Sequence, residues 1–290
     1  MKAAYAGAGG PALVLEGGGM RAQYTSGVLD YFLEAGTAFS YVVGVSAGIS
    51  NAVSFVSGQH GRNREVFRRF AGDPRYFSWR NWISKGNPFG MDFIYRELPK
   101  HLPFDREAFE ASPIRFRIGA TDCETGEAAY FDRGDAELED ALIASASLPL
   151  VGRMAKVNGR LYLDGGIADP IPFRRAEADG HLRRAAVLTR NRGYRKPPPD
   201  AAKRAAIWAR YRKHPGLMRA VMEQHETYNR QMDELEREEA AGRVFVIRPT
   251  APLAVGRYSQ DRSELERLYE NGRADAEACA GALGAYLLGG

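Results

Sequence analysis

Short apolar runs alternate along this chain with longer stretches in which apolar residues recur every three or four positions. Short runs rich in Val, Ile and Leu are typical of buried strands, and the three-to-four spacing is typical of helices. The predicted strands span residues 12–15, 41–45, 114–120, 128–131, 160–163, 185–188 and 244–247. Because helical stretches lie between many of these strands, the pattern predicts an α/β fold with a mostly parallel sheet.

A serine lies at one of the predicted strand-to-helix junctions. Residues 44–48 read G-x-S-x-G, directly between the strand at 41–45 and a predicted helix over 47–57. Gly44 and Gly48 would allow the strand and the helix to pack closely around a tight turn, and the helix N-terminus would stabilise negative charge on the serine oxygen. The pattern therefore predicts Ser46 as a nucleophile, and the alternative is a serine in a glycine-rich turn without chemistry.

Three glycines, here called the glycine loop (Gly17, Gly18 and Gly19), separate the first predicted strand from a predicted helix over 21–34. Their backbone N–H groups can receive a developing oxyanion, and Arg21 would hold the loop or favour anionic substrates. The spacing also fits a loose dinucleotide-binding pattern, but no acidic residue ends the next strand and no Lys-Ser/Thr pair follows the glycines. We favour an oxyanion hole and keep a nucleotide- or phosphate-binding module as the alternative.

A nucleophilic serine needs a general base, and the sequence offers two candidates. Asp164 ends the predicted strand at 160–163 and is followed by Gly165 and Gly166, which permit close approach of another backbone. Such a carboxylate could take the serine proton directly, although Asp-Gly-Gly is also an ordinary turn sequence. The alternative is a Ser-His-Asp triad, for which His181 is the best placed of the five histidines.

These motifs resemble those of the patatin-like phospholipase family, which carries a G-G-G-x-R/K oxyanion loop, a G-x-S-x-G nucleophile elbow and a D-G-G/A base motif. They stand here in the same order at residues 17–21, 44–48 and 164–166, and the resemblance covers residues 12 to about 190. It implies a three-layer α/β/α sandwich, a Ser46–Asp164 dyad without histidine, and hydrolysis of lipid acyl esters.

Residues 195–199, which end in three prolines, predict a stiff, exposed connector. We expect a patatin-like catalytic domain over residues 10–196 and a mainly helical C-terminal extension over residues 197–290 that packs on the core. Its predicted helices span residues 201–212 and 217–239, and Ser263 with Glu266 would form a capping box that opens a final helix.

An aromatic segment at residues 70–104, between the elbow and the base, holds two of the three tryptophans. It predicts either a lid or acyl-chain pocket above Ser46, or aromatic filling beneath a long insertion.

Charge and composition limit the classes of function that the sequence allows. The 290 residues carry a net charge of +4, which suits an anionic lipid surface, and no nucleic-acid-binding module is visible. No apolar run has the length of a membrane-spanning helix, and the two cysteines and the histidines lack metal-ligand spacing. We therefore expect a lipid or acyl-ester hydrolase that needs no metal or cofactor. We also expect it to be cytoplasmic and to contact the inner face of the membrane at most transiently.

Overall fold

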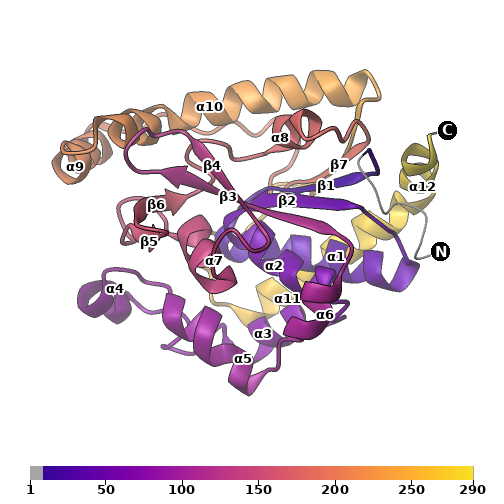
Figure 1. Ribbon diagram of the computed structural model, residues 1–290, viewed down its shortest axis with the longest axis horizontal. Helices are drawn as coiled ribbons and strands as arrows, with labels where there is room; N and C mark the ends of the chain where they lie inside the picture. Colours follow the sequence, from indigo (N-terminus) through magenta and orange to yellow (C-terminus); the bar gives the residue numbers. More distant parts are fainter. Residues whose placement is uncertain (1–8, 290) are drawn as a thin grey trace.

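A mixed sheet of eight strands forms the centre of the protein in the computed structural model, which describes residues 9–289 (Figure 1). The strands are β1 (Ala12–Leu15), β2 (Tyr41–Val45), β3 (Arg115–Asp122), β4 (Ala128–Asp132), β5 (Ala155–Val157), β6 (Arg160–Asp164), β7 (Arg184–Val187) and β8 (Val244–Ile247). Seven of them match the predicted strands to within two residues at either end. β5 was not predicted, because its three residues are too short to stand out as an apolar run.

The strands follow the order β5-β6-β3-β2-β1-β7-β8, and β4 pairs with β3 outside this path. The neighbours β3, β2, β1, β7 and β8 are parallel, as the alternation of strands and helices predicted. β4 and β6 both pair with β3 in the antiparallel sense, and β5 pairs with β6 in the same sense.

Helices cover both faces of the sheet. They are α1 (Gln23–Ala35), α2 (Ser46–Val56), α3 (Arg62–Phe70), α4 (Trp79–Lys85), α5 (Leu98–His101), α6 (Arg106–Ala111), α7 (Leu138–Ala146), α8 (Phe173–Ala178), α9 (Ala201–Tyr211), α10 (Pro215–Ala240), α11 (Arg262–Ala278) and α12 (Ala280–Leu288). A 3-10 turn (Gly19–Ala22) precedes α1, and a π-helical turn (Phe93–Glu97) precedes α5.

Alternate residues of the central strands supply the two apolar layers of this α/β/α sandwich. Leu13 and Leu15 join the core under α1, α2 and α11, whereas Val14 and Val43 face the core under α8 and α10. In Figure 1 α10 runs above the sheet, and α1, α2 and α11 lie below it. The three-layer sandwich expected from the sequence is confirmed.

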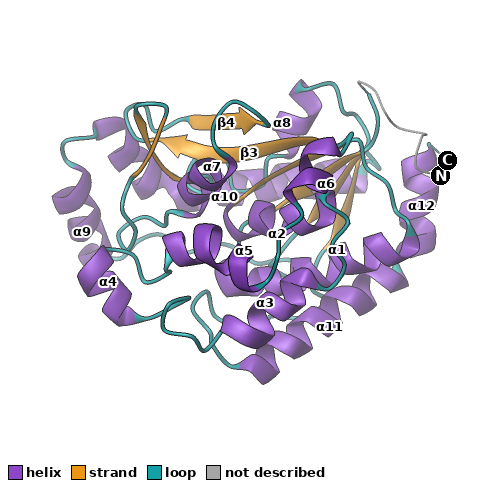
Figure 2. Cartoon of the chain, turned by 60° about the horizontal axis from the view of Figure 1, so that its bottom comes forward, coloured by secondary structure: helices purple, strands orange, loops and turns teal. Residues whose placement is uncertain are grey.

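The C-terminal residues pack directly against the first helix. α11 lies beside α1 (Figure 2), and the two helices approach so closely that a Cβ at Gly27 or Gly272 would overlap the backbone of the other helix. Two details of this region differ from the prediction. Asp261, not Ser263, caps α11, because its carboxylate accepts the amide protons of the next turn. The expected final helix is also interrupted at Cys279, which separates α11 from α12.

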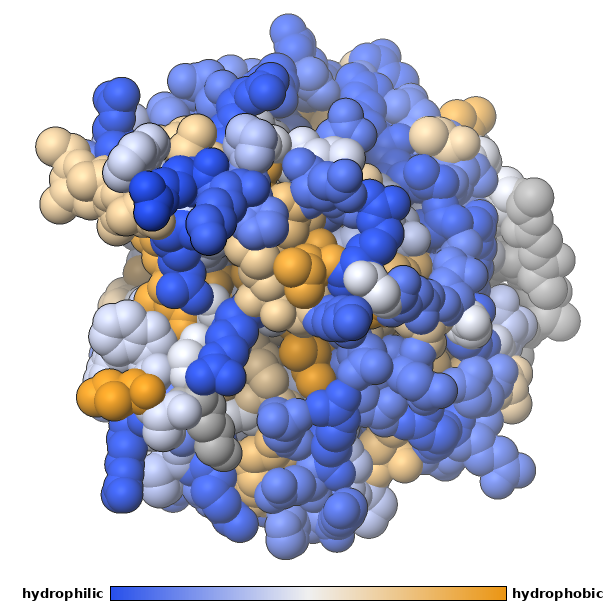
Figure 3. Space-filling view, turned by 60° about the vertical axis from the view of Figure 1, so that its left-hand side comes forward, coloured by the Kyte–Doolittle hydropathy of each residue, from blue (hydrophilic) through white to orange (hydrophobic). Residues whose placement is uncertain are grey.

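None of the helices within residues 9–289 combines the length and the apolar character that crossing a bilayer requires. α4 and α9 lie on the left-hand side of the molecule in Figure 1. Figure 3 shows this side from the front: its surface is mostly hydrophilic, with hydrophobic side chains near the middle and at one edge.

Candidate active site

Two strands run toward each other along the same edge of β3 and bring Ser46 and Asp164 together. β4 occupies the other edge of β3, so β2 and β6 must share the remaining one. On that edge Val45, the last residue of β2, pairs with Gly119, and Asp164, the last residue of β6, pairs with the next residue, Ala120. The nucleophile candidate and the base candidate are therefore positioned by adjacent steps of one hydrogen-bonded ladder.

Ser46 occupies the sharp turn from β2 into α2. Its φ of 55° is in the left-handed region, which is strained for a residue with a side chain and recurs at functional sites. The Ser46 amide donates to Ser145 Oγ at 2.8 Å, and that hydroxyl donates to the Gly119 carbonyl at 2.7 Å. Gly44 and Gly48 lie where a Cβ would collide with Leu15 and Glu16, so the motif glycines let this turn pack against β1.

Asp164 is 4% exposed and has one carboxylate oxygen free for chemistry. Its Oδ1 accepts the Gly166 amide proton at 2.8 Å, whereas the buried Oδ2 has no hydrogen-bond partner of good geometry among residues 9–289. Burial raises the pKa of Asp164, and the nearby Ser46 hydroxyl is the strongest group that opposes this rise, followed by the charge of Arg257. Gly165 permits the tight contact of this turn with the Gly119 carbonyl.

The glycine loop lies directly against the nucleophile. A Cβ on Gly17 would be 2.8 Å from the Ser46 Cβ, and one on Gly18 would be 2.9 Å from Thr189 Oγ1. The amides of Gly17, Gly18 and Gly19 donate to no acceptor among the described residues, which leaves three N–H groups beside Ser46. Unpaired backbone donors next to a nucleophile are the arrangement that stabilises an oxyanion.

Arg21 projects from the 3-10 turn into the protein and is 6% exposed. Burial lowers its pKa to about 10, and the charges of Arg190 and Arg257 add to this effect. Its Nε has no hydrogen-bond partner within the described part of the chain.

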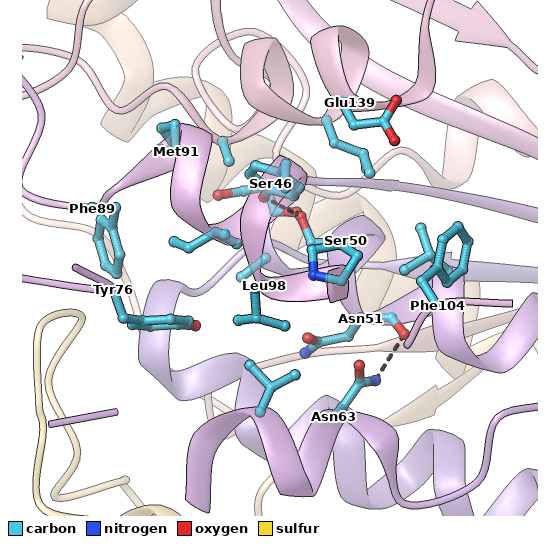
Figure 4. A pocket seen from close by; sticks show the side chains of 18 of the residues that line it. Ser46, Ser50, Asn51, Asn63, Tyr76, Phe89, Met91, Leu98, Phe104 and Glu139 are labelled. Atoms are coloured by element: carbon cyan, nitrogen blue, oxygen red, sulfur yellow. Dashed lines mark hydrogen bonds between the residues drawn. The ribbon is translucent and has the colours of Figure 1, made fainter. Parts of the chain in front are cut away.

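Two spaces of different character meet at Ser46. The larger, called the apolar cavity, has a volume of about 450 Å³ and is lined mainly by apolar side chains. In Figure 4 Tyr76 and Phe89 lie on one side of this cavity and Phe104 on the other. The smaller, called the polar chamber, has a volume of about 60 Å³ and is lined by the glycine loop, Asp164 and several basic side chains.

The aromatic segment at residues 70–104 has two locations in the structure. Tyr76, Phe89 and Tyr95 line the apolar cavity, so part of the segment forms its wall. Trp79 and Trp82 on α4 are instead about half exposed. Edge-on aromatic contacts connect the two groups, since the ring of Phe77 lies 5.7 Å from Trp79 and 4.9 Å from Phe89.

His181, the histidine suggested for a triad, lies at the opposite end of the sheet from Ser46. It stacks on Tyr41, the first residue of β2, and its Nδ1–H donates to the Gly10 carbonyl at 2.8 Å. No histidine lines the apolar cavity or the polar chamber. The geometry therefore does not support a triad through His181. The nucleotide-binding alternative is also unsupported, since about 60 Å³ beside the glycine loop is far smaller than a typical ligand pocket.

Comparisons with known proteins show the family to which the chain belongs. The family model "Patatin-like phospholipase" matches residues 13–177, which is more than half of the chain, and a "Domain of unknown function (DUF6363)" matches residues 214–288. The protein belongs to the patatin-like phospholipase family.

Curated relatives include "Uncharacterized protein YjjU" of Escherichia coli, 29% identical over 83% of this chain and 69% of the relative. "Uncharacterized NTE family protein Rv1063c" of Mycobacterium tuberculosis is 32% identical over 56% of this chain, which spans only 44% of that relative. Among solved structures, VipD from Legionella pneumophila aligns with a TM-score of 0.46 and 12% identity, over 95% of this chain and 67% of the other.

The sequence alone did not reveal several residues of the site. Ser145 fixes the Ser46 amide from 99 residues away in the sequence, and its local pattern did not predict that role. Arg190, Lys196 and Arg257 line the polar chamber, and they come from segments after β7 and after β8. In a chain with 40 basic residues, three of them do not stand out without the fold.

Proposed function

We propose that this protein is a serine-dependent lipid acyl-ester hydrolase in which Ser46 is the nucleophile and Asp164 the general base. The observation that carries the proposal is the meeting of β2 and β6 on β3. It brings a strained serine beside a carboxylate oxygen that has no other partner among residues 9–289. Membership of the patatin-like phospholipase family supports a lipid substrate.

In the proposed reaction Ser46 Oγ attacks the acyl carbonyl carbon while Asp164 Oδ2 accepts the hydroxyl proton. The carbonyl π bond opens, and the amides of the glycine loop stabilise the negative charge on its oxygen. When the tetrahedral intermediate collapses, the alcohol leaves with the proton from Asp164 and the acyl group stays on Ser46. Water then attacks the acyl carbon while Asp164 accepts its proton. The bond between the acyl carbon and Ser46 Oγ breaks, Asp164 returns the proton to Ser46 Oγ, and the free acid is released.

The apolar cavity is the natural place for the acyl chain, because it opens at Ser46 and is lined by side chains such as Phe89, Leu98 and Leu142. Burying each CH₂ group contributes about 0.8 kcal/mol, so a cavity of this kind favours longer chains.

Fluorophosphonate labelling followed by peptide mass spectrometry tests the nucleophile. We expect a single modified serine, Ser46, and we expect Ser46→Ala to lose labelling and to lower ester turnover by several orders of magnitude. Ser57→Ala is the matched control, since Ser57 lies at the other end of α2 and lines neither space. Near wild-type hydrolysis by folded Ser46→Ala would refute the assignment.

The proposal includes transient contact with a lipid surface through α4. Trp79, Trp82 and Ile83 are exposed on this short helix, Ile83 by 82%, and aromatic contacts connect Trp79 to the wall of the apolar cavity. Tryptophan favours the membrane interface because its ring is apolar and its N–H is polar.

Ile83→Asp should weaken sedimentation with phosphatidylglycerol vesicles. Leu182→Asp, which changes an exposed leucine at the opposite end of the sheet, should not. Equal sedimentation of both variants and the wild type would contradict the contact.

A further inference from the structure

Four basic side chains line the polar chamber, which meets the apolar cavity at Ser46. They are Arg21, Arg190, Lys196 and Arg257, and the acidic groups beside them are Glu16 and Asp164. Glu16 is already engaged, because its Oε2 accepts protons from the Thr189 amide at 2.6 Å and from the Thr189 hydroxyl at 3.2 Å. With both carboxylates ionised, the chamber keeps an excess of two positive charges.

None of these four cations of the polar chamber forms an ion pair with a carboxylate in the described part of the chain. Most other arginines, including the exposed neighbour Arg195, pair with Asp or Glu. Aromatic rings hold two of the four cations without neutralising them: the Arg190 guanidinium lies 4.2 Å from the Tyr194 ring, and Lys196 Nζ lies 5.2 Å from the Tyr228 ring. The buried Nε of Arg21 has no partner either.

Burial, and after it the neighbouring like charges, disfavour the charged forms of Lys196 and Arg21. Burial, then the charge of Arg257, lowers the pKa of Lys196 to about 8, and burial together with Arg190 and Arg257 lowers that of Arg21 to about 10. Cations that repel one another in a partly desolvated space are stabilised when an anion binds between them. Arginine guanidinium groups are well suited to phosphate, because they donate paired, charge-assisted hydrogen bonds.

We propose that Arg190, Lys196 and Arg257 form a phosphate-binding subsite for the alcohol side of the scissile ester. The inference rests on the proposed hydrolase function, since the apolar cavity would take the acyl chain and leave the polar chamber for the leaving alcohol. A volume of about 60 Å³ holds about four water-sized groups, which suits a phosphate and excludes a second acyl chain. The preferred substrates are then acyl esters that carry a phosphate close to the ester bond.

The subsite is built from segments that the patatin-like family model does not cover. Arg190 and Lys196 follow residue 177, and Arg257 lies within the residues matched by the domain of unknown function. Arg257 is also fixed to the glycine loop, because its carbonyl accepts the Met20 amide proton at 3.1 Å. The C-terminal part of the chain thus reaches the site and gives the subsite its position relative to Ser46.

Binding is tested first without catalysis, in the Ser46→Ala protein. Isothermal titration with inorganic phosphate and with glycerol 3-phosphate should give binding that weakens at least tenfold in Lys196→Gln and in Arg257→Gln. Lys196→Arg, which keeps the charge, should retain binding. Arg195→Gln is the matched control, because it removes the same charge from the adjacent exposed position. Unchanged binding in the two Gln variants, with folding verified by circular dichroism, would overturn the proposal.

Hydrolysis then distinguishes a head-group subsite from a site for free phosphate. We expect kcat/KM for 1-oleoyl lysophosphatidic acid to exceed that for 1-oleoylglycerol at least tenfold in mixed micelles, and Lys196→Gln to reduce this ratio. Equal values for the two esters would refute the head-group role even if inorganic phosphate binds. Failure of the hydrolase function itself would look different: neither ester would be cleaved and Ser46 would not be labelled, while phosphate binding would persist.

Discussion

One added methyl group at Gly17 tests whether the glycine loop positions the nucleophile. A Cβ at this residue would stand 2.8 Å from the Ser46 Cβ and 3.3 Å from the Val45 carbonyl oxygen. Ordinary van der Waals contact begins at 3.4 Å, so in Gly17→Ala the loop and Ser46 must separate by at least about 0.6 Å. The backbone N–H of residue 17 is retained, and therefore the substitution changes the geometry of the site without deleting a donor.

The expected loss follows from how steeply catalysis depends on position. A misplacement of about 1 Å can cost on the order of 100-fold in rate, so a shift of this size should lower kcat/KM by roughly 10- to 100-fold. This corresponds to about 1.4 to 2.7 kcal/mol of lost transition-state stabilisation. Initial rates on p-nitrophenyl butyrate give kcat/KM, and a thermal melt by circular dichroism verifies the fold.

Gly281→Ala is the control for the substitution itself. Gly281 lies in α12, and a methyl group there would meet no other part of the protein within 4 Å, so alanine should keep activity and stabilise the helix by up to about 1 kcal/mol. Wild-type kcat/KM in folded Gly17→Ala would mean that the loop does not set the position of Ser46, and the oxyanion-hole assignment would lose its geometric basis.

Three further outcomes are expected. Because burial raises the pKa of Asp164, which must be ionised to accept a proton, kcat/KM should fall with decreasing pH through a midpoint above the usual carboxyl value of about 4; a midpoint at or below 4 would contradict this. His181→Ala should lower the melting temperature through lost stacking on Tyr41 but keep kcat within about tenfold, whereas a general base is worth about 10²–10⁴-fold. EDTA should leave ester hydrolysis intact, since residues 9–289 contain no cluster of three or more metal-ligating side chains; a loss that one divalent ion restores would refute this.

The sequence predicted the elements of the fold well where local signals are strong. β1 and β2 end in glycine motifs and were predicted to the residue, and α2 begins at Ser46, one residue before its predicted start. The resemblance also identified Asp164 as the base candidate, but the sequence did not show how the fold brings Asp164 to Ser46. The alternation of strands and helices predicted a mostly parallel sheet, whereas β6 is antiparallel to β3 and reaches Ser46 because it meets β2 head-on. Pairing of this kind depends on long-range register, which the apolar pattern does not encode.

The cations of the polar chamber illustrate a second limit. Arg190 and Lys196 follow β7, while Arg257 lies about 60 residues further on, between β8 and α11. Nothing in their local sequence distinguishes them from arginines that form surface ion pairs such as Arg195–Asp233. Only the tertiary structure reveals that they face one space and lack acidic partners.

The same arrangement affects the pKa of the buried carboxylate that we propose as the base. Desolvation favours the neutral form of Asp164, and a protonated Asp164 could not accept the Ser46 proton. The charges of Arg257 and Lys196 act in the opposite direction and lower its pKa. α10 also holds the turn that follows Asp164, because Gln224 on this helix donates to the Gly166 carbonyl at 2.6 Å. The segments beyond residue 177 therefore act on the carboxylate that we propose as the base. Their charges oppose the rise of its pKa, Gln224 fixes the turn that follows it, and the same charges are those that we propose select a phosphate-bearing substrate.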